Sequence, residues 1–356
     1  MPLQSLPLPR LYPGYLVFSA ALARRGLSSG SLSRSGFAAA AVLGWLALAN
    51  PLAVWGACLL GFYAAGSKAT KVKADLKATY EESDHAAAAP SPSSPSDQTP
   101  PKSKAKAGGH RTALQVSCNA LIGVLFALLW RVLYSGELSA LTGSGGESWE
   151  DEGRWCVIAR EEDGGRRWSR ALVLGAVAFW GACCGDTFAS ELGILSPSPP
   201  YLPSTLRPTP RGTNGALSPF GTYVSFAGGI LVSVLAILTL VFQGQVDKCG
   251  RWVNEAGEWG WAGEVLAVGG AAGLGGSLID SLLGFLFQPT YYSPSRKLVV
   301  HHPPSSLPSK KSDKDGDDTI LLPGTAVLGA RLSNNGVNAV STAVVAAVAV
   351  AYGAFW

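Results

Sequence analysis

The chain has 356 residues, of which 47% are hydrophobic and 15% are charged, and its formal net charge at pH 7 is +4. Soluble domains usually carry about 25% charged residues, so this composition favours an integral membrane protein over a soluble one. The sequence contains no basic stripe with interleaved aromatic residues, which argues against a nucleic-acid partner. The small positive charge is interpreted instead as loop charge that orients the protein in a lipid bilayer.

Apolar runs with lengths close to that of a membrane span recur along the chain. In chain order we expect them at residues 11–23, 36–49, 51–66, 113–134, 170–187, 220–242, 263–287 and 335–356. The first run is short, and the second and third meet at Asn50 and Pro51, where proline ends or kinks a helix. The sequence therefore predicts an all-α, polytopic helical bundle with six to eight transmembrane helices, forming a single membrane domain over residues 1–356.

Two polar stretches between the apolar runs have compositions that are typical of disorder. Residues 83–110 are rich in Pro, Ser, Ala and Lys, and residues 293–318 form a second, basic loop. Segments of this kind cannot bury enough apolar surface to offset the entropy that ordering would remove. We expect both loops to be disordered.

The basic residues favour one side of the predicted membrane domain. With eight spans, the linker 24–35 and the loops 66–112, 188–219 and 288–334 share a side, and the positive-inside rule makes it the inner one. Nearly all polar residues of the apolar runs lie close to the same side. We expect a polar cluster at the inner membrane face, in the endoplasmic reticulum or another endomembrane rather than a plastid or mitochondrion.

Three carboxylates stand at the inner ends of apolar runs. Asp186 and Glu191 follow the fifth run, and Asp280 lies near the end of the seventh. Charged groups at membrane depth are costly and usually functional, and Mg²⁺ prefers carboxylate oxygens and carries phosphates with it. We predict that the three form a catalytic metal site, in which one can also act as a general base. Helix capping or a structural hydrogen bond between helices is the alternative.

Two segments on the same side are candidates for phosphate binding. Lys68 and Lys71 lie one helical turn apart at the end of the third run, where anchoring at the membrane interface explains them equally well. Arg211, Thr213 and Asn214 belong to a glycine-rich turn that leads into the sixth run. Backbone amides at such a helix start, with an arginine fork beside them, can hold a phosphate. The turn lacks the Gly-Lys-Ser/Thr of a Walker A motif, and a plain turn is an equal alternative.

Three amides interrupt apolar runs at the same side: Asn119, Asn335 and Asn338. We predict that they orient substrate oxygens, although such amides often serve only to hold transmembrane helices together. The glycine-rich stretch 269–276 is expected to allow close helix packing and is assigned no chemistry.

Six sequence blocks together resemble a known family. The blocks are GSKATKVKADLK, HRTALQVSCNAL, CCGDTFASELGILS, RGTNGALSPFGTYVSFAGG, GSLIDSLLG and LSNNGVNAVST. In this order they look like the transmembrane protein 19 family, also called domain of unknown function 92. Ala216 and Leu217 depart from the family pattern, in which a second glycine and an aliphatic residue are expected, so the turn there is expected to be slightly altered.

The resemblance implies a polytopic helical membrane protein, and one branch of the family, in plants and cyanobacteria, is similar to phytyl-phosphate kinase. Such an enzyme converts an isoprenoid monophosphate in the bilayer to the diphosphate with a nucleoside triphosphate, CTP being favoured, and Mg²⁺. The animal and fungal branch has no settled activity, and the linkers of this chain look more like that branch. A lipid-phosphate kinase is therefore the leading hypothesis. An ion-coupled transporter that uses Asp186 and Asp280, or a non-catalytic membrane scaffold, remains the alternative.

Overall fold

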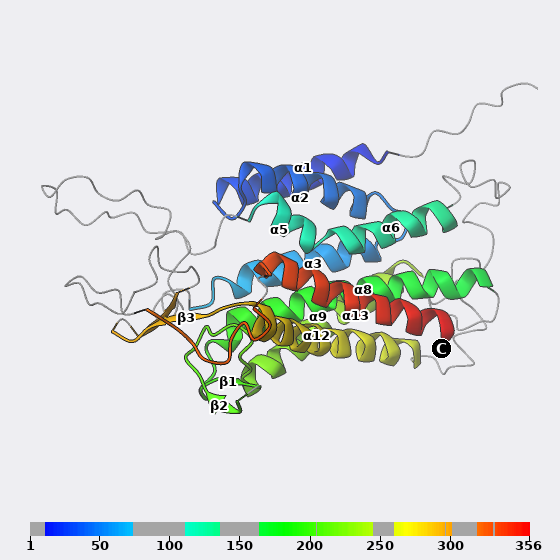
Figure 1. The fold of residues 1–356 in the computed structure, drawn as a ribbon. Coiled ribbons are helices and arrows are strands. Elements are labelled where there is room, and N and C mark those ends of the chain that lie inside the picture. Colours follow the sequence, from blue (N-terminus) through cyan, green and yellow to red (C-terminus); the bar gives the residue numbers. More distant parts are fainter. Residues whose placement is uncertain are drawn as a thin grey trace, which may run out of the picture.

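The structure, a computed structural model, describes residues 11–73, 111–135, 164–203, 205–244, 260–295, 297–300, 319–329 and 332–356. Within these ranges most residues belong to long helices that lie side by side in one bundle (Figure 1). Two small groups of short strands lie at one end of the bundle.

The helices coincide with the apolar runs that the sequence predicts. They are α1 (Pro13–Ser28), α2 (Arg34–Leu48), α3 (Val54–Ala69), α5 (Ala113–Cys118), α6 (Leu121–Tyr134), α8 (Gly164–Gly193), α9 (Pro219–Phe242), α12 (Gly260–Phe287) and α13 (Asn334–Phe355). By length and composition α8, α9, α12 and α13 can each cross a membrane, and α2 and α6 are shorter apolar helices. The prediction of a polytopic, helical membrane protein is confirmed.

The strands are short and antiparallel. Strand β1 (Tyr201–Leu202) pairs with β2 (Arg207–Pro208), and β3 (Tyr291–Ser293) lies between β4 (Leu298–Val300) and β5 (Ile320–Leu321). Ser293 and residues 298–300 belong to the loop 293–318 that the sequence predicts to be disordered, and they pair here as strand residues. Residues 301–318 and the other predicted loop, 83–110, lie outside the described residues.

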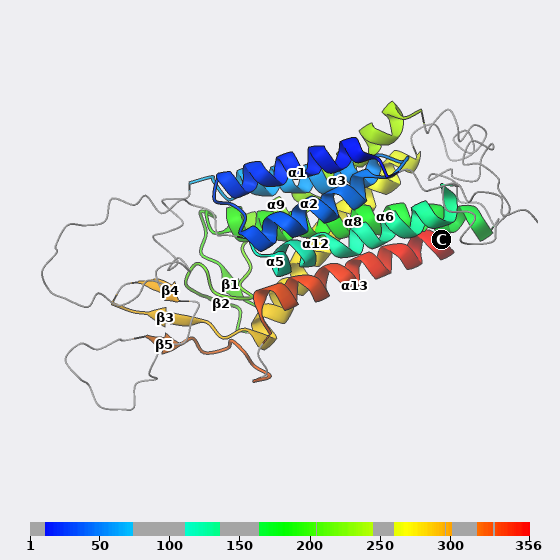
Figure 2. The same cartoon turned by 90° about the horizontal axis from the view of Figure 1, so that it is seen from above.

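Successive helices run in opposite directions along the bundle, except that α6 continues in the direction of α5 (Figure 2). The strands therefore lie beside the ends of α3, α8 and α12 and the starts of α5, α9 and α13. We call this the strand end, and we call the end at which α13 finishes the C-terminal end. The described parts of the segments that the sequence predicts to share one membrane side lie at the strand end.

Helix α8 is the central element of the bundle. It packs against α3, α6, α9, α12 and α13. In its most apolar stretch 83% of the residues are buried, against 44% in α9 and 39% in both α12 and α13. The fully buried Phe179 and Trp180 of α8 belong to the same core cluster as Trp55 of α3 and Trp130 of α6. The other helices are thus arranged around α8 and expose their remaining apolar faces outward, as membrane helices do.

Glycines bring the backbones of α8, α9 and α12 into direct contact. A Cβ atom added at Gly185 of α8 would lie 2.6 Å from the Cα of Gly273 on α12 and 2.7 Å from the carbonyl oxygen of Ser225 on α9. A Cβ at Gly229 of α9 would overlap the carbonyl oxygen of Gly269 on α12. Only glycine allows helices to approach this closely. The expectation that stretch 269–276 serves packing agrees with these contacts.

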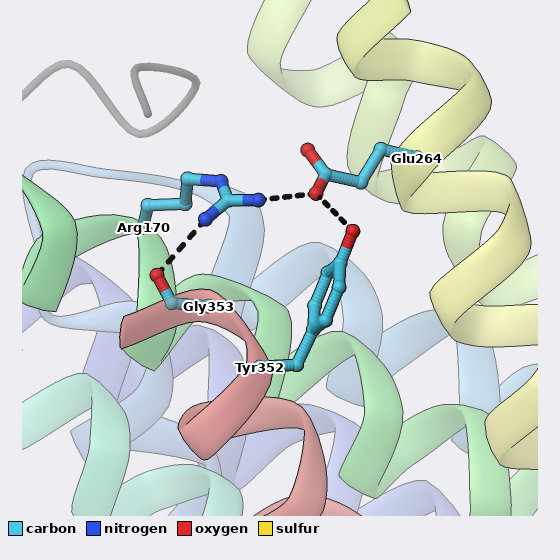
Figure 3. A network of polar contacts seen from close by, with 4 residues as sticks. All are labelled: Arg170, Glu264, Tyr352 and Gly353. Carbon is cyan, nitrogen blue, oxygen red and sulfur yellow. Dashed lines mark hydrogen bonds and ion pairs between the residues drawn. The ribbon is translucent and has the colours of Figure 1, made fainter. Parts of the chain in front are cut away.

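A buried ion pair joins α8, α12 and α13 near the C-terminal end (Figure 3). The Arg170 guanidinium contacts Glu264, donates through Nη1 to the carbonyl oxygen of Gly353 at 2.9 Å, and lies 5.7 Å from the centre of the Tyr352 ring. The Tyr352 hydroxyl donates to Glu264 Oε1 at 2.8 Å. The side chains of Arg170 and Glu264 are only 2% and 10% exposed, so each charge is balanced by the other.

The glycine contacts can be tested with one substitution and its neighbour. Gly273→Ala would place a Cβ 2.5 Å from the carbonyl oxygen of Ser225, so α9 and α12 must move apart. We expect a loss of about 1–3 kcal/mol in the free energy of unfolding in detergent, as for other overpacked cores. Gly275→Ala is the matched control, because nothing in the described residues lies within 4 Å of its added Cβ. Equal stability of the two variants would contradict the proposed contact.

Removing one partner of the ion pair should be more damaging than removing the tyrosine hydroxyl. Glu264→Gln leaves the Arg170 charge buried without a carboxylate, which usually costs about 3–5 kcal/mol. Tyr352→Phe removes one hydrogen bond to a charged group, about 1.5–3 kcal/mol. Thermal unfolding in detergent checks the order. As a control, the double variant Arg170→Met, Glu264→Leu should lower the thermal midpoint less than Glu264→Gln does alone. A larger decrease in the double variant would show that Arg170 tolerates the loss of its partner.

Candidate functional site

Two of the predicted carboxylates meet between α8 and α12 at the strand end. Asp186 directly follows Gly185, whose contact with Gly273 holds the two helix backbones together. Asp280 lies about two helical turns after Gly273 on α12. The two carboxyl groups are half-buried and lie within hydrogen-bonding reach of each other. Close glycine packing is therefore what brings two acidic side chains from distant parts of the sequence into one site.

Helix α13 adds two polar side chains to this pair. The amide nitrogen of Asn338, in the orientation that satisfies its hydrogen bonds, donates to Asp280 Oδ1 and to the carbonyl oxygen of Asn334, both at 3.0 Å. The Ser341 hydroxyl lies 3.4 Å from the same Asp280 oxygen and 3.1 Å from the carbonyl oxygen of Asn338. Both donors fix the Asp280 carboxylate from the side of α13. We call Asp186, Asp280, Asn338 and Ser341 the acidic site.

The sequence analysis named Asn338 but missed Ser341. Ser341 is buried, with 1% of its surface exposed, and it follows Asn338 by three residues. Residues with this spacing share a helix face, so the pattern could have identified it.

The third predicted carboxylate does not join the acidic site. Glu191 is half-buried on α8, five residues beyond Asp186, which turns it about 140° around the helix axis. Among the described residues no group of three or more His, Cys, Asp or Glu side chains is placed to hold a metal ion. A metal ion at the acidic site would therefore be held by two carboxylates, with its other ligands supplied by water or a bound phosphate.

The break between α5 and α6 lies against α8 about one helical turn before the acidic site. The thiol of Cys183, one turn before Asp186, lies 4.0 Å from the carbonyl oxygen of Asn119 in this break. Asn119 is half-buried, as is Asn335 in the first turn of α13, and α5 contacts α13. These two predicted amides thus lie at the same end of the bundle as the acidic site, and neither is hydrogen-bonded to it in the structure as described.

The predicted lysines lie at the same end but at the surface. A Cβ added at Gly66, near the end of α3, would lie 3.4 Å from the side chain of Thr187, the residue after Asp186. Lys68 and Lys71 follow Gly66 and are exposed. Their ammonium groups are therefore available to a ligand that approaches the strand end from water, and a role as interfacial anchors fits the same position.

The glycine-rich turn packs onto the end of α12, and most of its polar groups stabilise that packing. Asn214 donates from its backbone to Thr290 Oγ1 at 3.0 Å and from its side chain to the carbonyl oxygen of Pro289 at 3.1 Å. The Thr213 hydroxyl is buried and donates to the carbonyl oxygen of Pro210 at 2.7 Å. Gly215 has a φ of +75°, and an added Cβ would lie 2.5 Å from the backbone nitrogen of Phe285.

Arg211 also turns towards the protein. Its Nη1 donates to the carbonyl oxygen of Ile194, just beyond the end of α8, at 2.6 Å. The turn therefore contacts the chain just beyond α8 as well as the end of α12. In the structure the side chains of Arg211, Thr213 and Asn214 hold the turn in place, and their part in phosphate binding stays a prediction.

The donors of the acidic site suit a hard divalent cation. Mg²⁺ is usually bound by one or two carboxylates together with water and phosphate oxygens. Two carboxylates that face each other repel unless a proton or a cation lies between them. Asp186 and Asp280 would hold the ion, while Asn338 and Ser341 keep Asp280 in position. The residues present therefore fit Mg²⁺.

The fold and the site define a polytopic helical membrane protein with a paired-carboxylate site at one end of its bundle. The chain belongs to the integral membrane protein DUF92 family, whose sequence profile matches residues 17–346.

Relatives of this chain occur in plants, archaea and cyanobacteria. Protein PGR of Arabidopsis thaliana is 29% identical over 287 residues, which cover 81% of this chain and 77% of that protein. An uncharacterized membrane protein of Methanocaldococcus jannaschii is 33% identical over 33% of this chain and 40% of its own length. One of Synechocystis is 44% identical over 19% of this chain and 26% of its own length. No solved structure matches the chain.

Metal binding at the acidic site can be measured without any substrate. Mg²⁺ should raise the thermal midpoint of the purified protein, because a ligand that binds only the folded state stabilises it by about 2.7 kcal/mol at 100 times its Kd. Asp186→Asn and Asp280→Asn should each abolish this shift, and Glu191→Gln should retain it. An undiminished shift in both aspartate variants would contradict the assignment, and a loss in Glu191→Gln would add that residue to the site.

Proposed function

We propose that this protein is a lipid-phosphate kinase that converts an isoprenoid monophosphate to the diphosphate at the expense of a nucleoside triphosphate. The observation that carries the proposal is the acidic site: two facing carboxylates, oriented by an amide and a hydroxyl, near the end of membrane-spanning helices. A lipid phosphate carries its charged group at this depth and its hydrocarbon chain in the bilayer. The resemblance to phytyl-phosphate kinase suggests the isoprenoid class and CTP as the nucleotide.

The reaction needs little covalent participation by the protein. An oxygen of the lipid phosphate forms a bond to the γ-phosphorus while the bond from that phosphorus to the β,γ-bridging oxygen breaks, and its electron pair leaves with the nucleoside diphosphate. The attacking oxygen is already anionic, so no strong base is required. Catalysis of such transfers consists mainly of positioning and charge stabilisation. Mg²⁺, when bound, supplies positive charge that offsets the negative charge of the phosphates.

The residues of the strand end have distinct roles in this proposal. Asp186 and Asp280 would bind the ion, and Asn338 and Ser341 would hold Asp280 in the binding orientation. Lys68 and Lys71, which are exposed beside the end of α3, would attract and hold the nucleotide phosphates. Asn119 and Asn335 would orient oxygens of the lipid phosphate. The strand end would face the cytosol, where nucleotides are found, in the endoplasmic reticulum or a related membrane.

The proposal is tested with purified protein in lipid vesicles, given CTP or another nucleoside triphosphate, Mg²⁺, and phytyl or geranylgeranyl monophosphate. We expect Mg²⁺-dependent formation of the lipid diphosphate. Ser341→Ala should lower kcat/KM by about 10–100-fold, as for other residues that orient metal ligands, and Asp280→Asn should lower it further. Gly275→Ala serves as the control, because no described atom lies within 4 Å of the Cβ that it adds.

The same preparation separates the kinase from the other functions considered. Failure to form diphosphate with any nucleotide, together with an ion flux into the vesicles that Asp280→Asn abolishes, would replace the kinase by an ion-coupled transporter. The absence of both activities in a folded protein would leave the scaffold hypothesis.

A further inference from the structure

Four arginines lie close together at the strand end of α1, α2 and α5. Arg24 and Arg25 stand near the end of α1, Arg34 is the first residue of α2, and Arg111 directly precedes the start of α5. Helix α2 contacts both α1 and α5, so the segments that carry these residues lie side by side (Figure 1). Arg24, Arg25 and Arg34 are exposed and Arg111 is half-buried. We call these four residues the arginine cluster.

Backbone hydrogen bonds of the turn between α1 and α2 hold the arginine cluster together. The Ser33 amide donates to the carbonyl oxygen of Arg111 at 3.1 Å, and the Arg111 amide donates to the carbonyl oxygen of Ser31 at 3.1 Å. The Ser29 amide donates to the carbonyl oxygen of Arg25 at 3.0 Å. The end of α1 and the start of α5 are therefore both fixed to the same short turn.

The positive charge of the arginine cluster has no acidic partner in the described part of the chain. The sequence contains no Asp or Glu before Asp75, and none between Arg111 and Ser135. Within the described residues none of the four guanidinium groups takes part in an ion pair or a side-chain hydrogen bond. Arg34 also lies at the N-terminus of α2, where the helix dipole disfavours a cation and the first turn holds no acidic residue. An anionic ligand would neutralise this charge.

The arginines of α1 and α2 continue the outward apolar faces of these helices. Val17 of α1 is 69% exposed, and Arg24 follows it by seven residues, which is two helical turns along the same face. On α2 the exposed Ala38 and Val42 follow Arg34 by four and eight residues, on the same side of the helix. Exposed apolar residues of a membrane bundle contact lipid chains, and arginines at the helix ends reach the head groups. The ligand of the cluster is therefore best supplied by a lipid.

The residue type distinguishes phosphate recognition from general anchoring at the membrane interface. Lysine and arginine satisfy the positive-inside rule equally well. The end of α3, on the same side of the bundle, carries Lys68, Lys71 and Lys73, whereas α1, α2 and the turn between them carry arginine and no lysine. A guanidinium group donates two parallel hydrogen bonds to a phosphate, which an ammonium group cannot do. The cluster thus has the donors that a lipid phosphate requires.

We propose that the arginine cluster binds the phosphate of a phosphomonoester phospholipid, such as phosphatidic acid, in the leaflet at the strand end. A phosphate monoester carries a charge of about −1.5 to −2 at pH 7, which suits four arginines better than the single negative charge of phosphatidylserine does. The acyl chains would lie against the outward faces of α1 and α2. Clusters of basic residues beside membrane helices typically bind anionic lipids. This inference does not depend on the kinase reaction, since no residue of the cluster belongs to the acidic site.

The binding is measured by native mass spectrometry of the full-length protein in detergent. The probes are phosphatidic acid, phosphatidylserine and phosphatidylcholine with identical acyl chains. We expect phosphatidic acid to bind most tightly and phosphatidylcholine most weakly. Arg24→Ala combined with Arg34→Ala, which removes one arginine from each helix, should lower the affinity for phosphatidic acid about 25-fold, because each basic residue near an anionic lipid contributes about fivefold.

Two further variants separate specific binding from general electrostatic attraction. Lys68→Ala combined with Lys71→Ala removes the same charge at the same end of the bundle, and it should weaken the binding of phosphatidic acid far less. Replacing all four arginines of the cluster by lysine keeps the charge and the orientation in the membrane. This variant should still bind phosphatidic acid more weakly than the wild type, because lysine cannot form the paired hydrogen bonds. Thermal unfolding in detergent checks that each variant is folded.

Several results would overturn the proposal. These are equal affinities for phosphatidic acid and phosphatidylserine, equal losses in the arginine and lysine double variants, and undiminished binding by the variant with four lysines.

Kinase assays in phosphatidylcholine vesicles separate the arginine cluster from a site for the lipid substrate. Arg24→Ala combined with Arg34→Ala should leave the KM for geranylgeranyl monophosphate unchanged. A rise in this KM that parallels the loss of phosphatidic acid binding would make the cluster part of the substrate site and overturn the proposal. Binding of phosphatidic acid by a protein that forms no diphosphate would refute the kinase and retain the cluster.

Discussion

The close backbone contact of α8 with α9 and α12 is the constraint on which the other features of this protein depend. At Gly185, Gly229 and Gly273 the helices approach to distances that no side chain would allow. In a bilayer, where apolar burial gives helices little reason to associate, such packing supplies much of the attraction. It also sets the position of Asp186, which follows the contact immediately, and so determines where a second carboxylate has to stand.

The two ends of the bundle contain different arrangements of buried charge, with opposite charges paired at one end and two like charges at the other. At the C-terminal end Arg170 and Glu264 neutralise each other, and Tyr352 completes the network. At the strand end Asp186 and Asp280 face each other, and the donors that α13 offers to Asp280 in the described part of the chain, Asn338 and Ser341, are neutral. The same three helices, α8, α12 and α13, carry both arrangements. Two opposite charges neutralise each other and need no further partner, whereas two facing carboxylates need a cation or a proton between them. This difference is the main reason to look for a functional site at the strand end.

Apolar run lengths identified the helices well, because a span must be long and continuous in sequence. The meeting of Asp186, Asp280 and Asn338 was predictable in outline, since alternating spans bring their polar ends to one side. The exclusion of Glu191 from that group was not predicted, because it depends on helix rotation and on which glycines touch. The Arg170–Glu264 pair was not predicted either, because it depends on which residues of α8 and α12 come into contact, and no local sequence pattern indicates this.

The outward apolar faces of the helices around α8 have a consequence for how the lipid of the proposed kinase would arrive. Such a lipid comes sideways from the hydrocarbon phase and never has to leave the membrane. Its encounter with the protein is then a search in two dimensions, governed by its mole fraction among the surrounding lipids. Apparent affinities would accordingly change when the vesicles are diluted with more lipid at constant aqueous volume, and stay constant when only water is added.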